Sequence, residues 1–344
     1  MFSPIAFFSA PEETPTPSFT GGTWIFGNHG SGTTRVGNML YSTSPTASTM
    51  TASWQSTFGD FFDMEWNKWS KFAWSAVWDK TIANNSNILT STNSTTWRTV
   101  TVSGLAAGYS GKPAMGPTIS VQFRYNGQQM VYTSDGLNFT ASTISVISPS
   151  NSDIRATAYN ETTGRYVAVV RNQATSIYYS DNGLNWTGTA AGGSADWGQI
   201  TSANGIFIRW RAGNILQTST DGINWVSRTI GVTPSWLTYS PTLNRWVGVG
   251  VNILVTSDDN GETWTTRTPI SNDGSSIGIA WSEEYAVFVA TRETTTTTNE
   301  LAWSSDGINW TRFTPTSNKS TNSYFFVRNN VAFAPGLLTD FYIP

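Results

Sequence analysis

Short apolar stretches recur along the chain, and turns rich in Gly, Asn and Asp separate them. Clear examples are residues 166–170, 246–249 and 285–289, each four or five residues long. Short runs of β-branched and aromatic residues bounded by such turns predict strands. No stretch shows the 3.6-residue period of an amphipathic helix. The pattern therefore predicts an all-β chain.

The predicted strands come in sets of four. In one set a first strand at 235–239 is followed by a strongly apolar second strand at 246–249 and a third at 253–257. The third strand ends in a recurring turn, in which a Ser or Thr is followed by Asp, Gly and, shortly afterwards, an aromatic residue. A fourth strand follows that aromatic residue.

This turn recurs about every forty residues. Its clearest copies lie at 180–186, 219–225, 257–264 and 305–310, weaker copies lie at 134–139 and 92–97, and a remnant ends at Trp54. A repeat of this length is typical of a propeller or solenoid. The sequence predicts a seven-bladed β-propeller with four-stranded antiparallel blades. The first blade lacks a good leading strand, so we expect the C-terminal segments 324–327 and 330–333 to complete it and close the ring.

The turn residues have local structural roles. The Asp accepts hydrogen bonds from nearby backbone N–H groups, and the Gly supplies the positive φ that a tight hairpin needs. The aromatic residue folds back between the sheets, where its large area stabilises packing. The residues assigned to these roles are Asp135, Asp181, Asp221, Asp259, Asp306, Trp97, Trp186, Trp225, Trp264 and Trp310.

The repeat resembles the Asp-box, or bacterial-neuraminidase, repeat, Ser-any-Asp-any-Gly-any-Thr-Trp. Ser257, Asp259, Gly261, Thr263 and Trp264 match it position for position. The resemblance covers roughly residues 21–344 and implies a sialidase-like propeller, with the box between the third and fourth strands of each blade on the face away from the active site. Asp-box propellers include sialidases, xyloglucan hydrolases, a sorting receptor, photosystem assembly factors and virion proteins. The resemblance therefore implies a fold and not one activity.

Composition narrows the function classes. Only 12% of the 344 residues are charged and the net charge is −3, which favours neither nucleic acid nor an anionic membrane as partner. The chain has no cysteine and one histidine, His29, so neither a thiolate nor a histidine metal cluster is expected. No apolar run is long enough for membrane insertion. We expect no cofactor and no metal.

Residues 1–20 stand apart from the predicted propeller at 21–344. Phe2, Ile5, Phe7 and Phe8 precede a proline-rich stretch that suits neither a helix nor a central strand. One interpretation is a floppy terminus. The other is an extended anchoring arm that docks onto other virion subunits.

Candidate ligand residues lie in the loops between second and third strands, on the face opposite the boxes. They are His29, Arg35, Lys80, Arg171, Arg211 and Arg292. A cationic ring at the propeller mouth would hold an anionic sugar or a carboxylate by charge-assisted hydrogen bonds, whereas the alternative is that these charges only solubilise the loops. Similarly, Trp197, Trp210 and Trp236 are either sugar-stacking platforms or part of the blade core.

Three functional hypotheses remain. The preferred one is a non-enzymatic virion surface protein of the bacteriophage tail or head-fibre type, anchored by its arm and presenting the propeller to a host-surface glycan or protein. It rests on a resemblance to phage proteins in the Thr-, Ser- and Asn-rich, charge-poor surface. The alternative is a glycoside hydrolase or sialidase-like enzyme whose activity a change of Asp79 or Glu293 should stop, although the Phe/Tyr-Arg-Ile-Pro signature of sialidases is absent. The third is a secreted or periplasmic assembly factor.

Overall fold

The regular structure of the protein is β-strand throughout the part that the computed structural model describes. The described residues are 23–28, 37–42, 49–56, 60–78, 87–92, 97–105, 110–124, 128–146, 153–171, 177–189, 198–211, 213–270, 274–294, 300–313, 316–317 and 330–334. Among them there is no helix long and apolar enough to cross a membrane.

Six sheets have four antiparallel strands each, and each sheet takes its strands from one continuous stretch of chain. The first two are β4 (Asp60–Asn67), β5 (Phe72–Trp78), β6 (Asn87–Ser91) and β7 (Arg98–Thr101), and β8 (Ala114–Met115), β9 (Ser120–Phe123), β10 (Gln129–Thr133) and β11 (Thr140–Thr143). The next two are β12 (Asp153–Asn160), β13 (Arg165–Arg171), β14 (Ile177–Ser180) and β15 (Thr187–Thr189), and β16 (Gln199–Ala203), β17 (Ile206–Arg211), β18 (Ile215–Ser219) and β19 (Val226–Thr229). The last two are β20 (Trp236–Ser240), β21 (Arg245–Gly250), β22 (Ile253–Ser257) and β23 (Thr265–Thr266), and β24 (Gly274–Ser282), β25 (Val287–Thr294), β26 (Glu300–Ser304) and β27 (Thr311–Phe313). Sequential neighbours pair because short turns join antiparallel strands.

The remaining sheet differs from these six. It contains β1 (Thr23–Asn28), β2 (Gly37–Ser42), β3 (Thr49–Ser56), β28 (Thr316–Ser317) and β29 (Asn330–Ala334), in the order β28-β3-β2-β1-β29. β29 lies antiparallel to β1, so the segment expected at 330–333 does join the N-terminal strands, and β28 lies parallel to β3.

The expectation of seven four-stranded antiparallel blades is therefore wrong. The propeller has six blades of four antiparallel strands each, and its remaining sheet is five-stranded and mixed. The N-terminal repeat supplies only three strands to this sheet, which takes two more from the C-terminal part of the chain. The remnant turn expected to end at Trp54 is also misplaced, because Trp54 lies within β3 and pairs with Met39.

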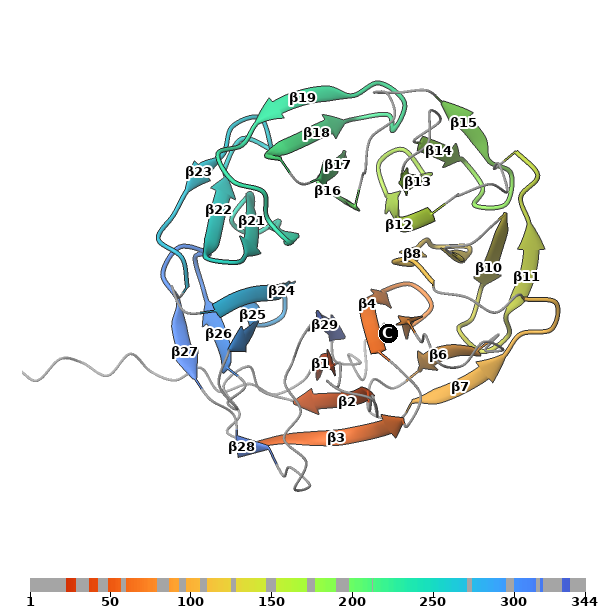
Figure 1. Cartoon of the computed structure of the whole chain (residues 1–344), viewed down its shortest axis with the longest axis horizontal. Coiled ribbons are helices and arrows are strands. Elements are labelled where there is room, and N and C mark those ends of the chain that lie inside the picture. Colours follow the sequence, from red (N-terminus) through yellow and green to blue (C-terminus); the bar gives the residue numbers. More distant parts are fainter. Residues whose placement is uncertain are drawn as a thin grey trace, which may run out of the picture.

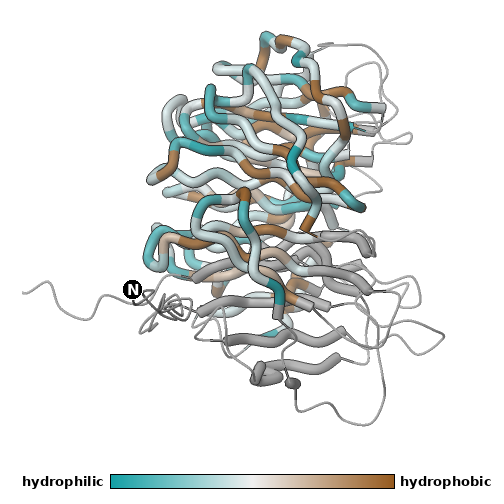
Figure 2. Tube along the Cα trace, turned by 90° about the vertical axis from the view of Figure 1, so that its left-hand side faces the viewer, coloured by the Kyte–Doolittle hydropathy of each residue, from teal (hydrophilic) through white to brown (hydrophobic). Residues whose placement is uncertain are grey.

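The sheets stand around a central channel, with the first strand of each four-stranded blade innermost and the fourth at the rim (Figure 1). In the side view, hydrophobic stretches run along the strands of neighbouring blades (Figure 2). The core consequently lies between the blades.

The second strand of each blade explains this packing. In β17, Phe207 packs toward the β12–β15 blade, while the next residue, Ile208, packs toward the β20–β23 blade. Both side chains are fully buried. A strand buried on both faces carries a nearly continuous apolar run. This is why the second strands have the strongest hydrophobic signal in the sequence.

The predicted arm lies outside the described residues. This includes the four apolar side chains assigned to it, Phe2, Ile5, Phe7 and Phe8.

Candidate functional site

The recurring turn is built by a short network of hydrogen bonds, seen clearly at 219–225. The backbone N–H of Gly222 donates to Ser219 Oγ at 2.8 Å. The N–H groups of Ile223 and Asn224 donate to Asp221 Oδ1 at 2.8 and 2.7 Å. Closely similar bonds form in the turns at 133–139, 257–264 and 304–310. The Asp in these four turns is thus a structural acceptor.

These hydrogen bonds stabilise the ionised carboxylates. Burial alone would raise the pKa of each Asp, but bonds from the following backbone N–H groups and from nearby side chains outweigh it. They lower the pKa of Asp135, Asp221 and Asp306 to about 2. For Asp259 burial again acts to raise the pKa, and the bonds from Thr263 and Ser257 lower it. A catalytic general acid needs the opposite, a carboxyl group that keeps its proton near neutral pH.

In the turn at 180–186 the assignment of Asp181 as acceptor is wrong. Asn182 takes that place, since its Oδ1 accepts from the N–H groups of Leu184 and Asn185 at 2.9 and 2.8 Å. Asp181 instead pairs with Arg165, whose Nε lies 2.6 Å from its carboxylate. The acceptor stands two residues after the Ser or Thr in the other turns, and this spacing in the sequence already points to Asn182.

Four of the predicted aromatic residues, Trp186, Trp225, Trp264 and Trp310, pack between blades as predicted. Trp186 meets Phe123 of the preceding blade edge-on, with ring centroids 4.9 Å apart. Its Nε1 donates to the carbonyl of Gly183 at 3.0 Å, which ties the ring to its own turn. The buried or half-buried residues of this group are Trp97, Trp186, Trp225, Trp264 and Trp310.

The turns mark one face of the propeller. They connect third to fourth strands, as the sequence predicted, for instance between β18 and β19. Because neighbouring strands are antiparallel, the turns joining first to second strands, such as 68–71 and 161–164, lie on the same face. We call it the motif face.

The predicted cationic ring lies toward the opposite face, and the structure describes little of it. His29, Arg35 and Lys80 lie outside the described residues, and Arg171 and Arg292 are described only as backbone in β13 and β25. The side chain of Arg211, at the end of β17, is half-buried. The sequence analysis missed a neighbouring arginine, Arg209, which is fully buried. Its burial lowers its pKa to about 9, and the positive charge of Arg211 adds to this effect.

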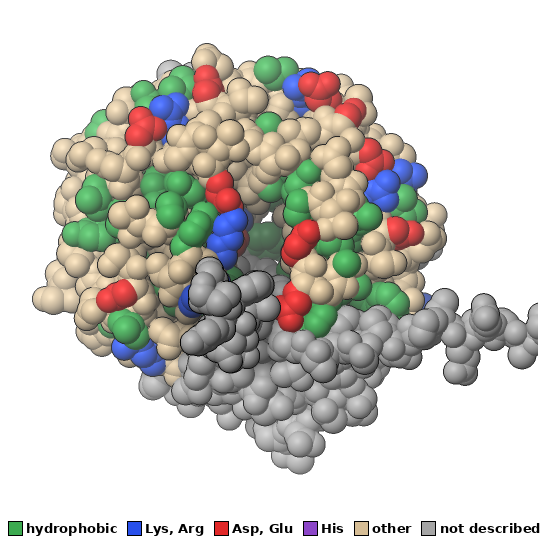
Figure 3. Space-filling model, turned by 180° about the vertical axis from the view of Figure 1, so that it is seen from behind, with side chains coloured by type: hydrophobic (Ala, Val, Ile, Leu, Met, Phe, Trp, Pro, Cys, Tyr) green, Lys and Arg blue, Asp and Glu red, His purple; other side chains and the backbone are tan. Residues whose placement is uncertain are grey.

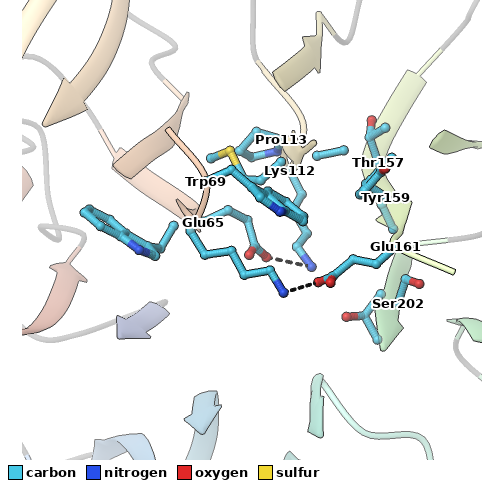
Figure 4. A pocket seen from close by; sticks show the side chains of 14 residues that line it. Glu65, Trp69, Lys112, Pro113, Thr157, Tyr159, Glu161 and Ser202 are labelled. Carbon is cyan, nitrogen blue, oxygen red and sulfur yellow. Dashed lines mark ion pairs between the residues drawn. The ribbon is translucent and has the colours of Figure 1, made fainter. Parts of the chain in front are cut away.

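The described pocket with the clearest functional chemistry lies elsewhere, in the central channel toward the motif face. It has a volume of about 160 Å³. It is lined by the inner strands β4, β8, β12 and β16, by the turns that follow β4 and β12, and by Lys112 and Pro113 just before β8. Its lining residues include Glu65, Lys68, Trp69, Lys112, Thr157, Tyr159, Glu161, Thr201 and Ser202 (Figure 4). None of them was predicted as a ligand residue.

Lys112 is placed in the channel by backbone pairing between blades. Its N–H donates to the carbonyl of Arg155, and its carbonyl accepts from the N–H of Thr157 at 3.1 Å. Its Nζ lies 2.8 Å from Glu65 Oε1 and 3.4 Å from the carbonyl of Ile200. One largely buried lysine thus contacts β4, β12 and β16.

A second ion pair crosses the pocket nearer to solvent. Lys68 Nζ lies 2.5 Å from Glu161, and both side chains are more than half exposed. Lys68 follows β4 and Glu161 follows β12, so the pair spans the β8–β11 blade between them. In Figure 4 the dashed lines of the two ion pairs lie side by side, one between Glu65 and Lys112 and the other ending at Glu161.

Aromatic rings border the same pocket. Trp69 is 37% exposed, and Lys68 lies over it with Nζ 4.9 Å from the ring centroid. Tyr159 meets Trp69 edge-on at 5.8 Å. Of the tryptophans suggested as sugar platforms, Trp210 is buried in a core cluster and Trp236 packs against another, while Trp197 lies outside the described residues.

One buried polar group of the pocket lacks a protein partner. Thr157 is 1% exposed, and its Oγ1 has no hydrogen bond to the part of the chain that the structure describes. A buried hydroxyl without a partner costs free energy, on the order of 1–3 kcal/mol. A ligand group or an ordered water is the ordinary way to satisfy such a hydroxyl.

The charged groups at the channel belong to a wider pattern on the surface. Seen from the side opposite to Figure 1, acidic and basic side chains gather beside the central opening, and further pairs lie toward the rim (Figure 3). The described residues contain no group of His, Asp or Glu side chains that could hold a metal ion.

Comparison with known proteins supports the fold and nothing finer. No protein-family model matches the chain, and neither does any curated protein. Solved structures match it over most of its length. The chain is a β-propeller. A Bacteroides fragilis protein described as a candidate 6-phosphogluconolactonase is 10% identical, with 94% of this chain and 99% of that chain covered and a TM-score of 0.61.

Two further structures are similar at the level of fold. YCF48 bound to D1 peptide is 16% identical, covering 74% of this chain and 81% of its own, with a TM-score of 0.55. A chain of the nidogen/laminin complex is 9% identical, with 91% of this chain and 98% of that chain covered and a TM-score of 0.53. Identities this low carry the architecture, and the residues of the pocket must support any function by themselves.

Proposed function

We propose that the protein is a non-enzymatic binding protein whose ligand sits in the channel pocket on the motif face. The observation that carries this is the convergence of two ion pairs, an exposed Trp69 and the buried hydroxyl of Thr157 in one cavity. Pockets with a few convergent polar groups and an apolar border are the usual form of a ligand site. Three rigid blades hold these groups in place, which lowers the cost of ordering them on binding.

The same geometry argues against glycoside hydrolysis at this pocket. A glycosidase of the common type needs one carboxylic acid that is protonated and one that is ionised. Both carboxylates here, Glu65 and Glu161, are paired with lysines. Either carboxylate would have to leave its ion pair before it could act on a glycosidic bond.

The setting of this function remains the virion surface. This part of the proposal rests on the charge-poor composition and on the apolar, proline-bounded segment 1–20, which would dock onto other virion subunits. The hydrogen bonding of the motif turns supports the finer assignment to the Asp-box class. Removing residues 1–20 should abolish incorporation into the particle and leave the propeller folded; truncated protein that still assembles would contradict the anchor.

The binding function is tested with the full chain on an array of neutral glycans, acidic glycans and peptides. Peptides belong in the test because YCF48, a protein of similar fold, has been solved with a D1 peptide bound. Any ligand found is then assayed for turnover. We expect binding without cleavage.

A pocket-filling variant assigns that binding to the channel. Thr201 lines the pocket, and the indole of Thr201→Trp would occupy it. The variant should lose binding, whereas Thr187→Trp on an exposed outer strand should keep it. Equal binding by both variants, or cleavage of the bound glycan, would refute the proposal, provided that thermal unfolding shows both variants to be folded.

A further inference from the structure

We propose that the channel pocket takes a neutral sugar residue rather than an acidic one. The inference deepens the proposed function and rests on it. It departs from the sequence-based expectation of a cationic ring that holds an anionic sugar.

The charges of the pocket cancel within the pocket itself. Its charged lining residues are two lysines and two glutamates, joined as Lys112–Glu65 and Lys68–Glu161. Each lysine already holds a glutamate, whose negative charge repels a ligand carboxylate that approaches the same ammonium group. This repulsion is strongest at the inner pair, because Lys112 is largely buried and solvent screens the charges there only weakly. Ligand anions are therefore disfavoured, and ligand cations are disfavoured by the same argument.

A neutral hydroxyl can use both ion pairs without breaking them. It accepts a hydrogen bond from a lysine ammonium group and donates one to a carboxylate, and bonds to charged groups are the stronger kind. A ligand with several adjacent hydroxyls fits alternating donors and acceptors best. The two ion pairs bring two ammonium groups and two carboxylates to one pocket and so provide both kinds of partner.

The uncharged lining points the same way. Thr157, Thr201 and Ser202 line the pocket with hydroxyl groups. The Ser202 hydroxyl donates to the carbonyl of Ile206 at 2.9 Å and so retains acceptor capacity, while Thr157 Oγ1 is buried and has no partner among the described residues. Sugar hydroxyls both donate and accept, so they can satisfy each of these groups.

The size of the pocket favours one compact unit. Pockets for drug-sized ligands usually measure about 300–1,000 Å³, and this one measures about 160 Å³. Trp69 and Met115 supply apolar contact for the C–H faces of a sugar ring. The exposed Lys68–Glu161 pair crosses the cavity on its solvent side, where the hydroxyls of an entering sugar meet it first. A single sugar unit, free or at the end of a glycan, fits these dimensions.

The test is a calorimetric titration of the full chain with methyl glycosides of glucose, galactose and N-acetylglucosamine, and with glucuronic acid and sialic acid. A second arm uses polysaccharides that end in the same neutral units, which separates free sugars from glycan ends as the source. We expect at least one neutral sugar to bind and the acidic sugars to bind at least tenfold more weakly. Because the ligand is uncharged, its affinity should change less than twofold between low and high salt.

Two variants locate the contacts. Thr157→Val removes the buried hydroxyl with little change in shape, and Trp69→Ala removes the rim. Each should weaken neutral-sugar binding about five- to tenfold, because each loses a contact worth roughly one hydrogen bond or one aromatic face. Thr187→Val and Val226→Ala, on exposed outer strands, are the matched controls and should bind as the natural chain does. Thr201→Val, from another wall of the pocket, replaces Thr157→Val if that variant unfolds at a lower temperature.

The outcomes separate this inference from the proposed function. Tighter binding of an acidic sugar or a peptide, lost in Thr201→Trp, would overturn the neutral-sugar inference and leave the binding function standing. Neutral-sugar binding that Thr157→Val, Thr201→Val and Trp69→Ala leave unchanged would also overturn it. Absence of any pocket-dependent ligand would overturn both.

Discussion

Replacing Asp221 by Asn tests whether the charge of the motif turn, and not only its shape, stabilises the blade. The amide keeps one oxygen for the N–H groups of Ile223 and Asn224, as Asn182 does naturally in its own turn. It loses the negative charge and the second oxygen, which accepts from Asn224 Nδ2 at 2.7 Å. The variant should therefore fold with the same turn and be less stable at neutral pH.

The magnitude follows from the shifted pKa of Asp221. Burial would raise this pKa, but the hydrogen bonds lower it from 3.8 to about 2. At about 1.4 kcal/mol per pH unit the shift corresponds to roughly 2.5 kcal/mol. The carboxylate is partly open to solvent, which screens the interaction, so we expect a loss of about 1 kcal/mol at pH 7.

The pH dependence provides the decisive measurement. A carboxylate with a lowered folded-state pKa stabilises the fold above its unfolded pKa, and this contribution is lost as the pH falls through the folded pKa. The gap between natural protein and Asp221→Asn should stay constant above pH 5 and close between about pH 4 and 2. Urea unfolding at several pH values measures it. A gap of equal size at pH 2.5 and pH 7, or no gap at pH 7, would refute the argument.

Three other substitutions test the packing and the links between blades. Trp186→Ala should cost about 3–5 kcal/mol of unfolding free energy because the ring lies between two blades. Trp69→Ala, at an exposed ring, should cost less than about 1 kcal/mol. Equal losses in denaturant titrations would contradict the packing role of Trp186. Gly222→Ala should destabilise the fold by more than about 2 kcal/mol, since φ is +73° and the new Cβ would lie 2.5 Å from Val167 Cγ2. Gly164→Ala, where φ is +67° and the space around the Cβ is open, should cost only about 1 kcal/mol. Similar melting temperatures for the two variants would count against the clash. Arg245→Met removes both the ion pair with Asp258 and a 2.7 Å hydrogen bond to the carbonyl of Asp306 in the next blade, so it should lower the free energy of unfolding by about 1–2 kcal/mol. Lys68→Met removes only an exposed ion pair and should lower it by less than about 1 kcal/mol. An Arg245→Met variant as stable as the natural chain would exclude the link between blades.

Local chemistry was readable in the sequence wherever it depends on neighbouring residues. The second strands were visible because burial on both faces requires a continuous apolar run, as at Phe207 and Ile208. The turn at 219–225 was visible because all its partners lie within a few positions. The start of β25 was not readable in the sequence. It was expected at Tyr285, but Ala286 lies in a turn with φ +50° and the strand begins at Val287. Tyr285 and Ala286 are apolar like the strand itself, and they therefore conceal its boundary.

The composition of the five-stranded sheet could not be read from the repeat. β28 is two residues long and lies parallel to β3, from the other end of the chain. No local pattern specifies such a pairing, because long-range strand partners are chosen by the way the ring assembles. The period of the motif therefore predicted the propeller, while pairing between distant segments decided the form of this sheet.

The pocket shows the same division most clearly. By itself the sequence determined that the chain is a propeller, which turns recur and, except at Asp181, which Asp positions accept the turn's hydrogen bonds, since these depend on spacing along the chain. Only the tertiary structure decided that Lys112 meets Glu65, that Lys68 meets Glu161 across the intervening blade, and that Trp69 is exposed while Trp210 is core. Each of these residues looks ordinary in its own repeat. Their chemistry arises because the inner strands of separate blades converge on one channel, and the geometry of that convergence is written in no single segment.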